Sequence, residues 1–153
     1  MYCYNKFTIF TRFSTIQSII LRKYIVIILY MDFLIPAFTM LAMDSLYLTN
    51  IGGPLFSKNI KQIQKSDMKV SMYGVIGSYI LLIFSLYKFI IHEKKPPSDA
   101  FLLGLCIYGI FDFTNLAIFK DYSLFNSIID MLWGGVLYYS VTWITYKILG
   151  YKM

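Results

Sequence analysis

The 153-residue sequence has little charge and few residues suited to metal or redox chemistry. Only 14% of its residues are charged and 58% are hydrophobic, whereas soluble domains have about 25% charged residues. A single histidine, His92, excludes a histidine-based metal cluster and a catalytic triad. The two cysteines, Cys3 and Cys106, do not predict a disulfide, because the second lies inside an apolar run. Phosphate-binding loops, nucleophile elbows and zinc-ligand spacings are also missing, so no motif indicates a cofactor.

Long apolar runs dominate the sequence and are separated by short charged links. About 20 apolar residues suffice for a helix to cross a hydrocarbon core of about 30 Å. The sequence therefore predicts an all-α integral membrane bundle of four transmembrane helices, at about residues 33–49, 70–91, 100–119 and 124–149. These spans form one multi-pass membrane domain, residues 31–149, which follows a basic N-terminal extension, residues 1–30.

The N-terminal extension contains Lys and Arg but no acid. A second methionine, Met31, begins an apolar segment that could start the first span without it. The extension is interpreted as a dispensable leader, with an interfacial helix and a targeting signal as alternatives. Lys and Arg are in excess on the side of both termini, which indicates cytoplasmic termini, although that excess depends on residues 1–30.

The first link is expected to break the helix and then lie on the membrane surface. Asn50, Gly52, Gly53 and Pro54 are turn formers and helix breakers. Residues 55–69 follow with apolar side chains at near-helical spacing among four lysines, which predicts a short amphipathic surface helix. The net charge of +6 resides largely in such links, so the lipid bilayer is the expected partner and nucleic acid is not.

Three aspartates lie inside the apolar runs at one predicted depth. Asp44 is five residues before the expected end of the first span, Asp112 seven before the end of the third, and Asp130 six after the start of the fourth. At about 1.5 Å per residue, each carboxylate is roughly 8 to 10 Å from the same membrane face. If the bundle closes, the three acids can share one pocket.

Each acid also has a polar or aromatic companion on its own helix face. Asp44 precedes Tyr47 by three residues, and Asp130 precedes Trp133 by three. These side chains can donate the hydrogen bonds that a buried carboxylate needs. The candidate ligand or proton site thus consists of Asp44, Asp112, Asn115 and Asp130, with Tyr47, Tyr108, Trp133 and Gly134 in support.

No Lys or Arg lies between these acids, so they cannot all stay charged without a cation. Either some are protonated, or a metal ion or cationic ligand binds among them. The alternative is that each acid only makes hydrogen bonds that fix helix packing.

Three segments resemble a known family: MDSLYL from Met43, YGIFDFTNLAIF from Tyr108, and IIDMLWGGVL from Ile128. They are similar to D-x-x-W-L, Y-x-x-x-D-x-T-N-x-A and D-x-x-W-G in a family of small membrane proteins, domain of unknown function number twenty-one seventy-seven. Tyr47 replaces the usual Trp. The resemblance covers about residues 31–148 and implies a four-helix membrane protein, but it implies no activity. It adds Thr114 to the supporting residues.

Three functions fit these observations. The first is a module that binds or transports a proton, a cation or a cationic amphiphile at the carboxylates. The second is a structural or assembly subunit, in which Gly74 to Ser78 dock a homo-oligomer or another membrane partner. The third is a lipid-modifying enzyme that uses paired acids. No nucleophile or phosphate-binding Arg accompanies the acids, so the sequence does not favour an enzyme.

Overall fold

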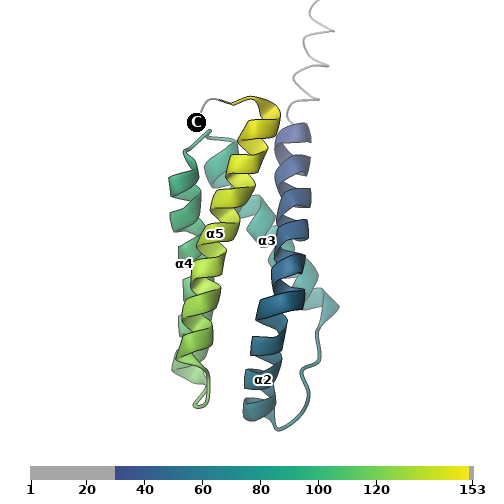
Figure 1. The fold of residues 1–153 in the computed structure, drawn as a ribbon, viewed down its shortest axis with the longest axis vertical. Helices are drawn as coiled ribbons and strands as arrows, with labels where there is room; N and C mark the ends of the chain where they lie inside the picture. The colour runs from purple at the N-terminus through teal and green to yellow at the C-terminus, as the bar shows by residue number, and fades with distance from the viewer. Residues whose placement is uncertain (1–29, 152–153) are drawn as a thin grey trace, which may run out of the picture.

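The computed structural model describes residues 30–151, which form a bundle of long helices (Figure 1). The first helix, Tyr30–Gln64, includes the π-helical turn η1 (Leu48–Gly52) and α2 (Gly53–Gln64). Next come α3 (Met72–Leu86) with the π-helical turn η2 (Tyr87–Ile91), α4 (Pro97–Ile118) and α5 (Leu124–Leu149). The predicted all-α fold is confirmed, whereas the N-terminal extension lies outside the described residues except for Tyr30.

Among the described helices, three are long and apolar enough to cross a membrane: Tyr30–Gln64, Met72–Ile91 and Pro97–Ile118. The fourth predicted span, α5, has 26 residues but is less apolar because polar side chains line its inner face. Ser127, Asp130, Thr142 and Thr145 are all buried there. The α5 helix thus contributes most of the polar groups inside the bundle.

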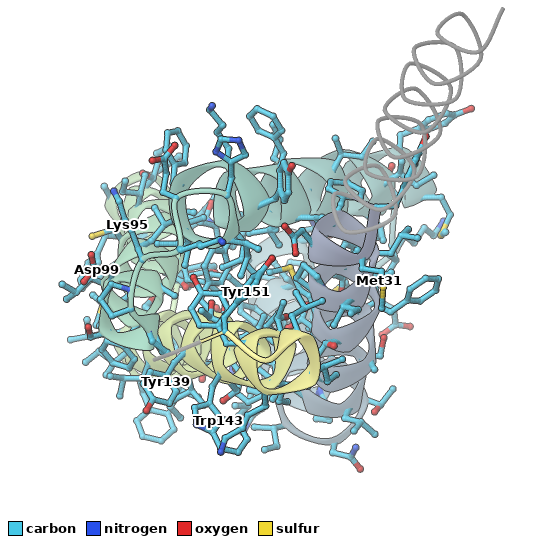
Figure 2. The ribbon with its side chains drawn as sticks, turned by 90° about the horizontal axis from the view of Figure 1, so that it is seen from above. Met31, Lys95, Asp99, Tyr139, Trp143 and Tyr151 are labelled. Carbon is cyan, nitrogen blue, oxygen red and sulfur yellow. The ribbon has the colours of Figure 1, made fainter. Side chains whose placement is uncertain are left out.

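Consecutive helices run in opposite directions (Figure 1), and the view along the bundle shows the first helix, α3, α4 and α5 around a common centre (Figure 2). The apolar core is formed largely by α5, the end of α3 and η2, where Leu137, Tyr138 and Val141 pack with Leu86 and Ile90. Tyr138 reinforces this contact, since its hydroxyl donates to the Leu82 carbonyl at 2.9 Å.

The expected break after the first span does not occur, because a π-helical turn absorbs the helix-breaking sequence. The Gly53 N–H donates to the Leu48 carbonyl, five residues back, and Pro54 then lies in the first turn of α2, where a missing N–H is tolerated. Side chains satisfy carbonyls nearby: Asn50 Nδ2 donates to Leu46 O at 2.7 Å, and Thr49 Oγ1 donates to Ser45 O at 2.8 Å. The first helix therefore continues to Gln64.

The segment predicted to form a surface helix is helical: it is α2, which continues the axis of the first helix and docks on the α4–α5 turn (Figure 1). Asn59 carries this contact: its Nδ2 donates to Asp121 O at 2.9 Å, and its Oδ1 accepts from Ser123 N at 3.2 Å. Asn126 Nδ2 adds a bond to Leu55 O at 3.2 Å. At about 1.5 Å per residue, 35 residues span about 52 Å, so the helix exceeds a hydrocarbon core of about 30 Å. The predicted depth of Asp44 was counted from a helix end at Thr49. Because the helix continues to Gln64, that estimate no longer applies.

The α4 and α5 helices pack closely through glycines. A Cβ on Gly104 would overlap the Gly134 carbonyl oxygen and lie 2.8 Å from Tyr138 Cβ. A Cβ on Gly134 would in turn overlap the Tyr108 ring and lie 2.7 Å from Tyr108 Cβ. Small residues allow such close backbone approach, and this approach brings Asp112 and Asp130 together.

Candidate functional site

The first helix and α5 exchange hydrogen bonds between two matching pairs of residues. The Tyr47 hydroxyl donates to Asp130 Oδ1 at 3.0 Å, and Trp133 Nε1 donates to Asp44 Oδ1 at 2.8 Å. The two rings stack with centroids 4.4 Å apart and planes 10° apart. Each aromatic residue therefore donates a hydrogen bond to the acid on the other helix. The sequence predicted these donors but paired each with the acid on its own helix.

Gly52 leaves room for the Tyr47 ring to reach across. A Cβ at residue 52 would lie 2.6 Å from Tyr47 Cε1, which is too close for any side chain. The π-helical turn that contains Gly52 thus carries the chain past Pro54 and also makes room for the tyrosine that binds Asp130.

Asp44 receives a second donor from α3. The Tyr79 hydroxyl donates to Asp44 Oδ2 at 2.7 Å, so both oxygens of this 5%-exposed carboxylate accept a hydrogen bond. Three helices meet at this side chain. It is the best satisfied of the three acids, and hydrogen bonds to a charged group contribute about 1.5–3 kcal/mol each.

Asp112 has a different environment. It is 0% exposed, and the Tyr122 hydroxyl donates to its Oδ1 at 3.1 Å. Its Oδ2 is buried without a hydrogen-bond partner among the described residues. The Asp112 and Asp130 side chains are neighbours across the α4–α5 contact. An unsatisfied buried oxygen beside a second carboxyl is unfavourable unless a proton or a cation joins them.

Asp44 and Asp130 line one cavity of about 380 Å³, together with Tyr108, Asn115 and Tyr122. Asp112 is not among the residues that line this cavity. Within residues 30–151, no three His, Cys, Asp or Glu side chains gather closely enough to hold a metal ion. The expectation that all three acids share one pocket is therefore corrected: Asp44 and Asp130 line one cavity, and Asp112 neighbours Asp130 without lining it.

The remaining candidates divide between the site and the outer surface. Tyr108 packs on Gly134 and lines the cavity, and Asn115 lines it one helical turn from Asp112. Thr114 is exposed on the outer side of α4 and is not brought to the acids.

Comparison with known families decides which family the chain belongs to. A family model described as "Predicted membrane protein (DUF2177)" matches residues 26–147, most of the chain. The chain is a member of family DUF2177. No curated protein and no solved structure matches it significantly. This DUF2177 member is thus a multi-pass membrane protein, as its motifs and its apolar helices indicated.

Two donors of this DUF2177 protein were not predicted from its sequence. Tyr79 lies on α3, which carries no acid of its own, and Tyr122 lies in the short turn after α4. In the structure burial and then the charge of Asp112 raise the pKa of Tyr122, so its hydroxyl stays a donor. In the sequence, each of these tyrosines lies close to the predicted level of the acids, which could have marked it as a possible donor. Only the packing of the helices shows which acid it binds.

The opposite end of this DUF2177 protein holds a further buried acid, Asp32. The Tyr151 hydroxyl donates to Asp32 Oδ1 at 2.7 Å, and the Lys94 ammonium lies 4.5 Å from the Tyr151 ring centroid. Burial and then the hydrogen bond to Asp32 raise the pKa of Tyr151 to about 12. In Figure 2 Tyr151 covers the end of the bundle, whereas Tyr139 and Trp143 point outward from α5. This contact ties the C-terminal end of α5 to the start of the first helix.

Proposed function

We propose that this membrane protein binds a proton or a cationic ligand at the buried carboxylates Asp44, Asp112 and Asp130. The observation that carries the proposal is the unpartnered Oδ2 of fully buried Asp112, next to Asp130. Two ionised carboxylates in contact repel each other, and the repulsion grows where water is excluded.

A proton shared between Asp112 and Asp130 would satisfy the free oxygen when no ligand is bound. Carboxyl pairs that cannot both ionise hold a proton in this way. The salt bridges among the described residues are Lys61–Asp67 and an exposed His92–Glu93 contact, so no basic side chain in that part of the chain neutralises the pair. The positive charge would come from a proton or from a bound cation.

Infrared difference spectroscopy tests this proposal directly. We expect a carboxylic acid C=O stretching band in the wild type at neutral pH that shifts in D₂O. The variants Asp112→Asn and Asp130→Asn should each lose this band. Asp67→Asn is the matched control, because Asp67 is exposed and paired with Lys61 at 2.7 Å; the band should persist there.

A thermal stability series gives the functional readout. We expect the unfolding temperature of the wild type to depend on pH and on added organic cations, and we expect both responses to disappear in Asp112→Asn/Asp130→Asn. An unchanged response in the double variant would refute the proposal. A wild type with no acid band, whose unfolding temperature responds neither to pH nor to organic cations, would refute it as well.

A structural or assembly role is the second candidate, and α3 supplies its observation. In the part of the chain that the structure describes, a Cβ on Gly77 would meet no atom within 4 Å, and one on Gly74 would meet only Ser71 Cβ at 3.9 Å. A neighbouring helix could approach this face closely. If the wild type is an oligomer in mild detergent and Gly74→Leu/Gly77→Leu is a monomer, while the acid variants keep their stability, this candidate replaces the first.

A further inference from the structure

A cavity of about 550 Å³ lies between α3 and α4 and is mainly apolar. Leu81, Phe84 and Phe111 line it and are 68%, 54% and 57% exposed, so its rim opens to the outside of the bundle, where lipid would lie. Of the residues that the structure describes, Asp130 is the only charged one that lines it. The cavity is therefore an apolar groove with a carboxylate at its inner end.

This groove adjoins the cavity that contains the acids. Tyr108, Phe111 and Asp130 line both, and Asp44 lines the second. A molecule that entered between α3 and α4 would thus meet Asp130 first and Asp44 beyond it. Cavities of about 300–1,000 Å³ enclose small organic ligands, and the groove falls in this range.

The charge at the inner end selects the headgroup. Asp130 is more than nine-tenths buried, and among the described residues only the Tyr47 hydroxyl forms a hydrogen bond with it, at Oδ1. Within residues 30–151, no Lys or Arg lines either cavity. A phosphate or carboxylate headgroup would be repelled, whereas an ammonium group would neutralise the acid and donate hydrogen bonds to its free oxygen.

We infer that the α3–α4 groove binds a single-chain alkylamine-type amphiphile, with its hydrocarbon chain along the groove and its ammonium group at Asp130. The inference rests on the proposed function, because it assigns a ligand class to the same carboxylates. The hydrocarbon chain contributes binding free energy by contact with Leu81, Phe84 and Ile107, and the ammonium group provides specificity.

The protein offers its own fluorescent reporter. The sequence has two tryptophans, Trp133 and Trp143. Trp133 lies at the site, where its indole binds Asp44, and Trp143 is 42% exposed. In a Trp143→Phe background all tryptophan emission comes from Trp133, and the full chain in phosphatidylcholine nanodiscs can be titrated with dodecylamine, dodecanol or propylamine.

We expect dodecylamine to change the emission saturably, dodecanol to leave it unchanged, and propylamine to bind at least tenfold more weakly than dodecylamine. Two neighbouring substitutions on α3 separate the groove from general effects. Ser78 lines the groove, so Ser78→Phe should fill it and weaken dodecylamine binding at least tenfold without changing the propylamine response. Gly77 does not line the groove and its Cβ position faces open space, so Gly77→Phe should leave both titrations unchanged.

The two proposals fail in different ways. If Ser78→Phe binds dodecylamine as tightly as Gly77→Phe does, the assignment of the hydrocarbon chain to the groove is overturned. If dodecanol binds as tightly as dodecylamine, the assignment of the ammonium group to Asp130 is overturned. The proposed function would still hold if propylamine bound and lost its effect in Asp130→Asn, with the acid band intact. If the wild type has no acid band and its unfolding temperature responds neither to pH nor to organic cations, the proposed function fails.

Discussion

The close contact of α4 and α5 makes a definite prediction for Gly104. Alanine at this position would place a Cβ onto the Gly134 carbonyl oxygen and 2.8 Å from both the Gly134 carbonyl carbon and Tyr138 Cβ. Two of these atoms belong to the backbone, which no rotamer change can move away. The helices would have to separate, and the Tyr108 ring that packs on Gly134 would lose its contact.

The expected cost can be stated as a difference between two variants. Overpacking a well-packed contact costs about 1–3 kcal/mol, and backbone atoms favour the upper end of this range. Alanine also gains up to about 1 kcal/mol over glycine in a helix. Gly77→Ala carries the same gain with nothing within 4 Å of its Cβ. The difference between Gly104→Ala and Gly77→Ala isolates the clash, and we expect about 3 kcal/mol, or roughly a hundredfold in the unfolding equilibrium.

Equilibrium unfolding in mixed micelles, followed by circular dichroism against the fraction of denaturing detergent, measures both variants. Gly104→Ala should shift the midpoint strongly to lower detergent fraction, and Gly77→Ala should match or exceed the wild type. A difference below about 1 kcal/mol would mean that α4 and α5 do not approach through Gly104, and the pairing of Asp112 with Asp130 would lose its structural basis.

Three further predictions follow from individual hydrogen bonds. Trp133→Phe keeps a ring to stack but removes the 2.8 Å bond to Asp44, so we expect a loss of about 0.5–2 kcal/mol that falls towards zero in an Asp44→Ala background, measured by a double-mutant cycle. Asn59→Ala should release α2 from the α4–α5 turn, so amide exchange in α2 should become faster while exchange in α5 stays slow. Equal exchange rates in α2 of the wild type and of Asn59→Ala would contradict the docking. Tyr151→Phe should lower stability at pH 8, and because the pKa of Tyr151 rises from 10.0 to about 12 in the fold, the gap to the wild type should close between about pH 10 and pH 12, in thermal unfolding. A constant gap would show that Tyr151 does not donate to Asp32 in solution.

Local sequence rules predicted the helices well but failed at residues 50–54. Asn50, Gly52, Gly53 and Pro54 are usually read as a stop, and in isolation they would be one. The structure passes through them because a π-helical turn accommodates Pro54, and because α2 gains hydrogen bonds to the α4–α5 turn through Asn59. The compensation comes from residues more than sixty positions away, which no local pattern includes.

The sequence alone determined that the protein is helical and membrane-embedded and that three acids lie within its apolar runs, since both follow from hydropathy and periodicity along one chain. Only the tertiary structure decided how these acids are used. The relative rotation and axial position of the helices place Tyr47 on Asp130 and Trp133 on Asp44, bring Asp112 against Asp130, and leave Thr114 outside. Spacing within a helix fixes which residues share a face, but the face that meets another helix is set by packing between distant segments, such as the contact of Gly104 with Gly134.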